Sequence, residues 1–337
     1  MPRGVLGRWV LALAAGLGLL LAGTARPAGA QGSWSERAPL LVPRAESSVA
    51  EVGGLIYVMG GYAGDRKVSD VVQVYDPRTD TWAYGPPLPM GVHHAMPAVV
   101  GGRLFLIGGE VGGSGGPTDP SMFTDAVYEL DPTGGAWLLR APLPQPRSAG
   151  GAGVIGGKVY VAGGRPPHGH DFAVYDPDDD AWTTLPDLPT QRNHLVAGVI
   201  DGKLYVVGRR FGAGSNSEMT ASVEVYDPIL NTWQAGTPLP EPRGGLTGAV
   251  VNGCLYAIGG EGNDADPRGI FDLNEAYNPR TDAWTRVAPP PIPIHGLNGG
   301  AALSGKLYIA GGATARGVSA DAVSQQLQVY HPDLACR

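Results

Sequence analysis

A nine-residue segment recurs along this chain at intervals of roughly fifty residues, a period typical of repeat architectures such as propellers and solenoids. The copies are VYDPRTDTW (74–82), ELDPTGGAW (129–137), VYDPDDDAW (174–182), VYDPILNTW (225–233) and AYNPRTDAW (276–284). In such folds each repeat forms one supersecondary unit that buries its apolar face against its neighbours. The repeat therefore has to be explained before any residue within it is considered for catalysis.

Each unit also contains a two-residue turn followed by an apolar segment that ends in glycine. The turns are Gly53-Gly54, Gly101-Gly102, Gly156-Gly157, Asp201-Gly202, Asn252-Gly253 and Ser304-Gly305. Gly, Asn and Asp tolerate the positive φ angles of tight hairpin turns, so each pair predicts a β-hairpin. Segments such as RLFLIGG (103–109) are apolar without alternation, which indicates strands buried on both faces.

The repeated nine-residue segment supplies two more strands. Pro lacks the N–H that a β-ladder needs and suits the second position of a turn, so the Asp-Pro pair predicts the end of a third strand. The Trp that ends each copy opens a fourth strand. Each unit therefore contains four antiparallel strands, which we name a, b, c and d in chain order.

The spacing of the tryptophans predicts that the units close into a ring. The next hairpin turn follows Trp82 and its counterparts in three further copies after 19 residues, and Trp34 has the same spacing to Gly53 although no a, b and c strands precede it. The sixth unit reaches LQVYHP (327–332) and lacks its Trp before Arg337. We therefore expect the strand around Trp34 to complete the sixth unit.

With its paired glycines, its Tyr and its spaced Trp in six concordant units, the chain from residue 33 to residue 332 resembles the kelch repeat. The resemblance implies an all-β fold, namely a six-bladed β-propeller whose last blade is closed by the N-terminal strand. It also implies that residues 31–337 form a single domain and that the repeated Tyr, Trp and Gly residues belong to the scaffold.

The first thirty residues, 1–30, have the features of a secretory signal peptide. Arg3 and Arg8 precede an apolar run over residues 10–22, and Ala28-Gly29-Ala30 offers a cleavage site. The run of 13 residues is too short to span a bilayer. We therefore expect a secreted or periplasmic protein without membrane insertion, and we expect it to be a monomer.

The charge of the chain argues against one class of partner. Its 24 basic and 31 acidic residues give a net charge of −7, and removal of residues 1–30, which contain three Arg and no acid, would change this to −10. An acidic chain of this kind lacks the basic footprint of a nucleic-acid-binding protein. We therefore expect no nucleic acid among its partners.

In a four-stranded antiparallel blade the loops alternate between the two faces of a propeller. The a-to-b hairpins and c-to-d turns lie on one face, which we call the bottom face, and they are constant in length. The b-to-c and d-to-a loops lie on the other, the top face, and the count from the first Gly of a glycine pair to the Asp position varies between 13 and 23 residues. Because variable loops on a rigid scaffold usually carry binding, the sequence predicts function on the top face.

Charged residues recur at two positions of the top face. Nine residues before each hairpin turn stand Arg44, Val92, Arg147, Arg192, Arg243 and His295. Just past the strand that follows each hairpin stand Tyr62, Glu110, Arg165, Arg210, Glu261 and Ala313. We expect the four arginines of the first set to ring the mouth of the central channel. Two interpretations stay open, because Arg forms forked hydrogen bonds with a ligand carboxylate but also forms ion pairs within a rim.

Histidines are concentrated on the same face. The top-face histidines are His93, His94, His168, His170, His194 and His295. We include His94, His194 and His295 with the arginines as candidate ligand-binding residues. His168 and His170 form a His-x-His pair, which alone is a weak metal motif. The sequence therefore predicts no specific metal and no cofactor.

The leading hypothesis is an exported binding or interaction protein whose top face binds an anionic small molecule, a glycan or a protein partner. The sequence favours this hypothesis over an enzyme. The alternative follows from the resemblance, because periplasmic sialic acid mutarotases are also similar to six-bladed kelch propellers. Opening a sugar ring needs an acid and a base, for which Glu110 and Glu261 are the candidates. A metal-dependent oxidase resembling galactose oxidase would need a Cys cross-linked to a Tyr at a top-face metal, and both cysteines fall on the bottom face.

The two cysteines, Cys254 and Cys336, form a candidate disulfide. Cys254 stands at a position that predicts solvent exposure, since other units carry there Arg103, Lys158, Lys203 and Lys306. Cys336 aligns with Thr81 on the same bottom face of the neighbouring blade. Export would allow the two thiols to pair.

Overall fold

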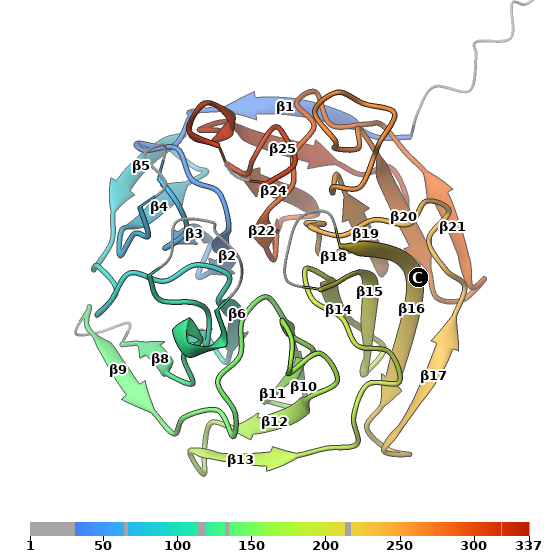
Figure 1. Cartoon of the computed structure of the whole chain (residues 1–337). Coiled ribbons are helices and arrows are strands. Elements are labelled where there is room, and N and C mark those ends of the chain that lie inside the picture. Colours follow the sequence, from blue (N-terminus) through green and yellow to red (C-terminus); the bar gives the residue numbers. More distant parts are fainter. Residues whose placement is uncertain are drawn as a thin grey trace, which may run out of the picture.

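The computed structural model describes residues 31–63, 67–112, 119–131, 135–212, 217–317 and 319–336. They form six sheets around one axis, and Figure 1 looks down that axis. The prediction of an all-β, six-bladed propeller is confirmed. The signal peptide assigned to residues 1–30 lies outside the described residues. Within the described parts of the chain, no helix is long and apolar enough to cross a membrane.

Each blade is a sheet whose first strand lies nearest the axis. Blade 1 contains β2 (Ser47–Val52), β3 (Leu55–Met59), β4 (Val72–Asp76) and β5 (Thr81–Tyr84), and blade 2 contains β6 (Met96–Val100), β7 (Arg103–Ile107), β8 (Val127–Leu130) and β9 (Trp137–Arg140). Blade 3 contains β10 (Gly151–Ile155), β11 (Lys158–Ala162), β12 (Phe172–Asp176) and β13 (Ala181–Thr184), and blade 4 contains β14 (Val196–Ile200), β15 (Lys203–Phe211), β16 (Glu218–Asp227) and β17 (Thr232–Gly236). Blade 5 contains β18 (Val250–Val251), β19 (Cys254–Ile258), β20 (Asn274–Asn278) and β21 (Ala283–Arg286), and blade 6 contains β23 (Ala301–Leu303), β24 (Lys306–Ala310), β25 (Leu327–His331) and β1 (Ser33–Arg37).

Three short elements supplement the blades. β22 (Leu297–Asn298) pairs in parallel with β2 and so joins the start of blade 6 to blade 1. Two 3-10 turns, η1 (Pro120–Met122) and η2 (Ala320–Ala322), lie in the b-to-c loops of blades 2 and 6.

The N-terminal strand closes the ring. β1 runs antiparallel to β25 with Trp34 opposite Tyr330, and Figure 1 shows the blue β1 along the outer edge of the red β25. The indole N–H of Trp34 donates to the carbonyl of Ala288, 2.9 Å away, which follows the last strand of blade 5. The closure that the tryptophan spacing predicts is therefore confirmed. It pairs the last blade's outer edge instead of leaving that edge open.

The repeated nine-residue segment makes the same contact in four blades. The Tyr hydroxyl near the end of strand c donates to the Asp or Asn five residues later, in the pairs Tyr75–Asp80 (2.6 Å), Tyr175–Asp180 (2.5 Å), Tyr226–Asn231 (2.6 Å) and Tyr277–Asp282 (2.5 Å). The Trp at the end of the segment donates its indole N–H to a carbonyl outside its own blade, as Trp82 does to Ala38 over 2.8 Å. These contacts hold the bottom turns and join neighbouring blades, which is a scaffold role.

The C-terminal segment covers the bottom end of blade 5. A disulfide bond joins Cys254, the first residue of β19, to Cys336. The backbone N–H of Cys336 also donates to the carbonyl of Asn252 over 2.9 Å. Cys254 is 0% exposed, so the expectation of a solvent position was wrong. Cys254 is buried because Cys336, which is 82 residues away in the sequence, is bonded to it.

Candidate functional site

Three successive residues lead from each d-to-a loop toward the first strand of the next blade, and each has its own environment. The first position, the arginine register, holds Arg44, Val92, Arg147, Arg192, Arg243 and Ile294. The second, the bridge register, holds Ala45, His93, Ser148, Asn193, Gly244 and His295. The third, the axial register, holds Glu46, His94, Ala149, His194, Gly245 and Gly296.

His295 belongs to the bridge register and not to the arginine register in which the spacing placed it. Gly260 donates its N–H to the carbonyl of Ile294, and in four other blades the equivalent bond ends at the arginine register. His295 instead forms a β-bridge with Ala313. The count from Trp284 to the next hairpin is one residue longer than in the other units, and the extra residue lies after His295. Counting back from the hairpin therefore misplaced it by one.

The arginines of the arginine register are buried within their own blades. Arg147, Arg192 and Arg243 are 2%, 0% and 0% exposed. Arg192 pairs with Glu224 on strand c over 2.8 Å and donates to the carbonyl of Val206 on strand b. These guanidinium groups face strands b and c, which corrects the expectation that they ring the mouth of the channel. The reason is that a buried guanidinium needs acceptors, and the carbonyls and carboxylates of these strands supply them.

Arg44 of the arginine register also contacts the scaffold, and burial changes the pKa values of two other arginines in this register. Arg44 is 2% exposed and donates to Ser69 Oγ over 3.0 Å. Burial lowers the pKa of Arg147 to about 10, although the nearby charge of Asp171 opposes the shift. Burial likewise lowers the pKa of Arg243 against the opposing charge of Glu275.

The axial register forms a closed ring of backbone hydrogen bonds around the channel. Each N–H donates to the carbonyl of the same register in the preceding blade: His94 to Glu46 (3.0 Å), Ala149 to His94 (2.9 Å), His194 to Ala149 (2.8 Å), Gly245 to His194 (2.9 Å), Gly296 to Gly245 (3.1 Å) and Glu46 to Gly296 (2.6 Å). The four non-glycine members have φ angles between 52° and 59°. This left-handed conformation costs an L-residue roughly 1–2 kcal/mol. The ring therefore holds side chains at the axis against a backbone penalty.

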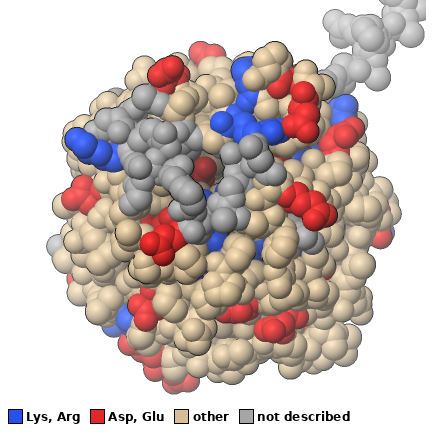
Figure 2. All heavy atoms as spheres, in the orientation of Figure 1, with Lys and Arg blue, Asp and Glu red and all other residues tan. Residues whose placement is uncertain are grey.

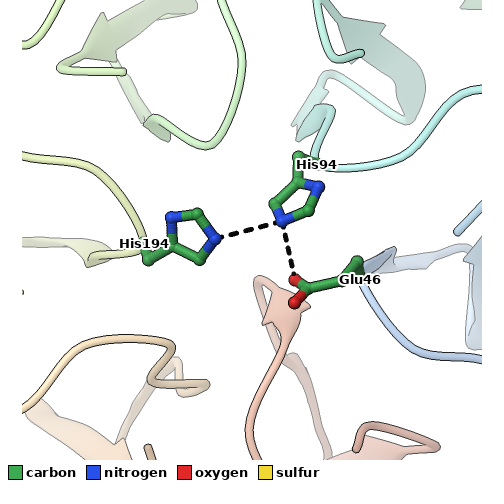
Figure 3. Close-up of side chains that lie close together, drawn as sticks. All are labelled: Glu46, His94 and His194. Carbon is green, nitrogen blue, oxygen red and sulfur yellow. Dashed lines mark hydrogen bonds and ion pairs between the residues drawn. The ribbon is translucent and has the colours of Figure 1, made fainter. Parts of the chain in front are cut away.

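Three of these side chains meet on the axis (Figure 3). His94 Nε2 lies 3.0 Å from Glu46 Oε2 and 3.0 Å from His194 Nε2. Glu46, His94 and His194 are 5%, 2% and 3% exposed. Ligand atoms of the three residues lie within 4.8 Å of one another. We call Glu46, His94 and His194 the axial triad.

Two arginines reach the triad from neighbouring blades, Arg165 just after β11 and Arg210 near the end of β15. Arg165 Nη2 lies 3.2 Å from His94 Nε2, and Arg210 Nη2 lies 2.6 Å from His194 Nε2. Arg165 also lies 3.5 Å from the carboxylate of Glu110. Arg210 forms a buried ion pair with Glu261. The structure thus brings together six predicted site residues: His94, His194, Arg165, Arg210, Glu110 and Glu261.

Two further histidines adjoin this group. His295 lies 3.9 Å from the carboxylate of Glu261 through Nδ1, and its Nε2 lies 2.6 Å from the carbonyl of Ala315. His93 contacts His94 through the Nδ1 atoms of both rings. Its Nε2 lies 3.1 Å from the carbonyl of Gly112. The bridge register thereby supports the axial register from outside.

The electrostatics of the triad favour a neutral His194 beside an ionised Glu46. Burial lowers the pKa of His194 well below its usual value, and the charges of Arg210 and Arg165 lower it further. Burial by itself raises the pKa of Glu46. The charge of a protonated His94 and the hydrogen bond that it donates, followed by the charges of His295 and Arg210, outweigh burial and hold the pKa well below its usual range.

Glu46 and His93 were not among the predicted site residues. A signal for Glu46 was present, because it stands two residues after Arg44, where other units carry His94 and His194. The His-x-His pair plays a different part. His168 Nδ1 lies 2.9 Å from Asp171 within the b-to-c loop of blade 3. His170 Nδ1 lies 2.6 Å from the carbonyl of Leu188 and so joins that loop to the segment after β13.

The fold, with its glycine pairs and its axial site, defines a kelch-type β-propeller. A family profile described as the KLHDC2/KLHL20/DRC7 Kelch-repeats domain matches residues 31–208 and 93–312. The chain belongs to this family of kelch-repeat proteins. A kelch propeller suggests a binding or protein-interaction role.

Relatives of this chain are kelch proteins of greater length. The Kelch-like protein terF of Aspergillus terreus (strain NIH 2624 / FGSC A1156) is 30% identical over 319 residues, which cover 90% of this chain and 57% of that protein. Beta-scruin of Limulus polyphemus is 30% identical over 266 residues, with 78% and 24% covered. Kelch-like protein 36 of Bos taurus is 28% identical over 286 residues, with 83% and 45% covered. The chain spans roughly half or less of these proteins.

A solved structure described as "Structure of YjhT" has the same architecture. It superposes with a TM-score of 0.67 at 16% sequence identity, covering 86% of this chain and 96% of that one. At this level of identity the similarity concerns the fold alone.

Proposed function

We propose that this chain is an exported binding protein that recognises an anionic, carboxylate-bearing ligand at the axis of its top face. The observation that carries the proposal is the convergence of Arg165 and Arg210 on the axial triad. Each guanidinium group donates to an imidazole nitrogen, that of His94 and that of His194 respectively.

An imidazole is a weak partner for a guanidinium group, because a neutral ring does not compensate its charge. A carboxylate accepts forked, charge-assisted hydrogen bonds from Arg that are roughly twice as strong as neutral ones. A ligand carboxylate would therefore replace the imidazoles as partner of Arg165 and Arg210. The ion pairs with Glu110 and Glu261 would not have to break for this exchange.

The charge of the surrounding surface does not select an anion by itself. Figure 2 shows acidic and basic side chains mixed over the face seen in Figure 1, and the whole chain carries a net charge of −7. Beyond about 10 Å such surface charges are screened at ordinary salt concentrations. Selection would therefore depend on the short-range contacts of the two arginines.

A sugar mutarotase is the second hypothesis, with Glu110 and Glu261 as acid and base. Glu261 is 0% exposed and paired with Arg210, whereas Glu110 is 7% exposed. A reaction that needs two accessible proton-transfer groups fits this pair less well than binding does. NMR of a freshly dissolved acidic sugar tests the hypothesis, since a mutarotase would accelerate exchange between the anomers.

A thermal-shift screen of the purified chain without residues 1–30 tests the binding proposal. Ligand at 100 times its Kd stabilises a protein by about 2.7 kcal/mol. We expect acidic sugars and small organic acids to raise the Tm, with neutral sugars as negative controls. Arg165→Gln should abolish the rise.

Arg147→Gln is the matched control, because Arg147 lies in the same blade as Arg165 but faces the scaffold. We expect it to lower the Tm of the free protein and to leave the ligand-induced rise in place. A rise that survives Arg165→Gln, or that neutral sugars produce equally, would contradict the proposal.

The export part of the proposal depends on residues 1–30 and has its own test. Mass spectrometry of the protein from the culture medium or the periplasm should find a chain that begins at Gln31. Recovery of the uncleaved chain from the cytoplasm alone would refute it.

A further inference from the structure

The hydrogen-bond partners of His194 determine which of its ring nitrogens carries the hydrogen. Nδ1 lies 2.6 Å from Asn193 Oδ1, and the amide nitrogen of Asn193 donates to the carbonyl of Gly212, which orients the amide. His194 Nδ1 is therefore the donor. Nε2 faces Arg210 Nη2, which can only donate, so His194 Nε2 carries a lone pair.

The same reasoning applies to His94 through its neighbour His93. His93 Nε2 lies 3.1 Å from the carbonyl of Gly112, which can only accept, and 3.0 Å from the hydroxyl of Tyr62, whose oxygen can accept as well. With Nε2 as the donor, His93 Nδ1 is an acceptor. His94 Nδ1 contacts that acceptor and therefore carries the hydrogen of its ring. His94 Nε2 faces the donor Arg165 Nη2 and so also carries a lone pair.

With these tautomers, three acceptor atoms lie close together at the axis. His94 Nε2 lies 3.0 Å from His194 Nε2 and 3.0 Å from an oxygen of Glu46, and with these tautomers no hydrogen atom lies between them. Acceptor atoms at such a distance repel unless positive charge lies among them, and the N–H groups of Arg165 and Arg210 supply part of that charge. The triad therefore offers a cation two imidazole nitrogens and one carboxylate oxygen, in competition with these two hydrogen bonds.

The formal charges of the surrounding group lead to the same conclusion. With neutral imidazoles, the arginines Arg165 and Arg210 face three buried carboxylates, those of Glu46, Glu110 and Glu261. The group is one positive charge short of balance. Isolated buried charges are costly, so an added cation would stabilise this group.

We propose that the axial triad binds a divalent transition-metal ion such as Zn²⁺. Two imidazoles and one carboxylate form the ligand set of catalytic zinc sites and of non-haem iron sites, which keep coordination positions open. Ligand atoms about 2.0–2.2 Å from a tetrahedral Zn²⁺ lie roughly 3.3 Å apart, close to the observed separations. This inference goes beyond the proposed binding function and can be tested without any organic ligand.

The surroundings of the triad match those of known metal sites. Metal-bound histidines almost always donate their second ring N–H to an acceptor, which holds the ring and its tautomer. His194 does this to Asn193, and His94 does it to His93. The guanidinium groups of Arg165 and Arg210 oppose a cation, but they also stand beside the open coordination positions, where an anion would bind both the metal and an arginine.

Two competing assignments are outcomes of the test. In the first, the cation is a proton, and His94 is an imidazolium ion that donates to Glu46. In the second, the metal binds to His93, His94 and Glu110 instead of the axial triad. Ligand atoms of these three residues also lie within 4.8 Å of one another.

Calorimetric titration of the untagged chain with Zn²⁺ and with Co²⁺, after treatment with EDTA, separates these assignments. We expect one ion per chain and visible absorption bands from the Co²⁺ form. Glu46→Gln and His194→Gln should each abolish stoichiometric binding. Glu110→Gln, the isosteric change in the alternative cluster, should keep one ion per chain, although the loss of one carboxylate from the group should weaken the affinity. Asn193→Leu leaves the ligands in place and should weaken affinity by about 10–100-fold.

The proposal is overturned by wild-type protein that binds no ion, which assigns the cation as a proton. It is also overturned if Glu46→Gln binds as wild type does, or if Glu110→Gln is the variant that loses the metal. Melting curves in EDTA show whether each variant is folded. If only one of Glu46→Gln and His194→Gln is folded, that variant alone tests the proposal. Failure of the anion screen with intact metal binding would refute the proposed function alone.

Discussion

At the bottom rim the blades repeat one contact, whereas at the axis each blade contributes a different group to the same position. Tyr75, Tyr175 and Tyr277 each donate to an Asp five residues later in an equivalent turn. The axial register instead holds one carboxylate, two imidazoles, one methyl group and two glycines, supplied by Glu46, His94, His194, Ala149, Gly245 and Gly296.

This difference distinguishes scaffold from site. Identical contacts are expected where blades must hold their neighbours at one spacing, because stability of a repeat array depends on equivalent interfaces. Different side chains at one register have no such function, and at the axis they are kept in a left-handed conformation that glycine would adopt without strain. The same contrast separates Arg192, which is paired within its blade, from Arg210, which contacts the triad.

The largest effect of a substitution is expected at the arginine register. Arg192→Met leaves Glu224 as a buried charge without its guanidinium partner, and breaking a buried pair in this way costs about 3–5 kcal/mol. Denaturant unfolding of the variant and the wild type measures the loss. Its Zn²⁺ affinity should remain that of the wild type, so a parallel loss of metal binding would break the distinction between scaffold and site.

The next largest effect is expected from the disulfide at the bottom of blade 5. The Cys254–Cys336 bond spans 82 residues, and Cys336→Ser should lower the free energy of unfolding by about 2–4 kcal/mol through the gain in chain entropy of the unfolded state. Reduction of the wild type should reproduce the loss and should not affect the variant. Unchanged stability in both experiments would place the C-terminal segment outside the scaffold.

A smaller loss is expected from one repeated rim contact. Tyr277→Phe removes the hydrogen bond to Asp282 and should cost about 1 kcal/mol at pH 7. The bond from Tyr277, followed by a backbone N–H of Thr237, lowers the pKa of Asp282. Its stabilising effect is therefore present above the unfolded pKa of about 3.9 and is lost progressively as the pH falls from there through the lower folded pKa. Unfolding at pH 7 and pH 3 should therefore show the two proteins converging. Solvent screening keeps this effect small, and an equal difference at both pH values would disprove the assignment.

The smallest effect is a gain in stability at the axial register. Ala149→Gly relieves a left-handed alanine at φ 59° and should stabilise the protein by about 0.5 kcal/mol, after the extra entropy of glycine in the unfolded chain is deducted. The reciprocal change Gly245→Ala should cost about 1 kcal/mol, since its β-carbon would meet neighbours at 3.4 Å and only the backbone is strained. Metal affinity should be unchanged in both variants. A loss of stability in Ala149→Gly would show that the strain argument is wrong.

The ring closure could be predicted from the sequence, but several side-chain positions could not. The spacing from Trp34 to Gly53 predicted the pairing of β1 with β25, because a strand register is a local property of the repeat. The direction of the arginines depended on which carbonyls and carboxylates the neighbouring strands offer, which no spacing contains. Cys254 was assigned to solvent because its covering segment comes from the far end of the chain.

The six blades, their strand order, the closure and the face that carries the variable loops could all be predicted from short-range periodicity and turn chemistry. The meeting of Glu46, His94 and His194, and their contacts with Arg165 and Arg210, depend on the folded ring. These residues lie in different repeats, and a closed ring brings equivalent positions of all blades to one axis. Which side chains then touch depends on the left-handed backbone and on the ring of hydrogen bonds that forms only when all six blades are in place.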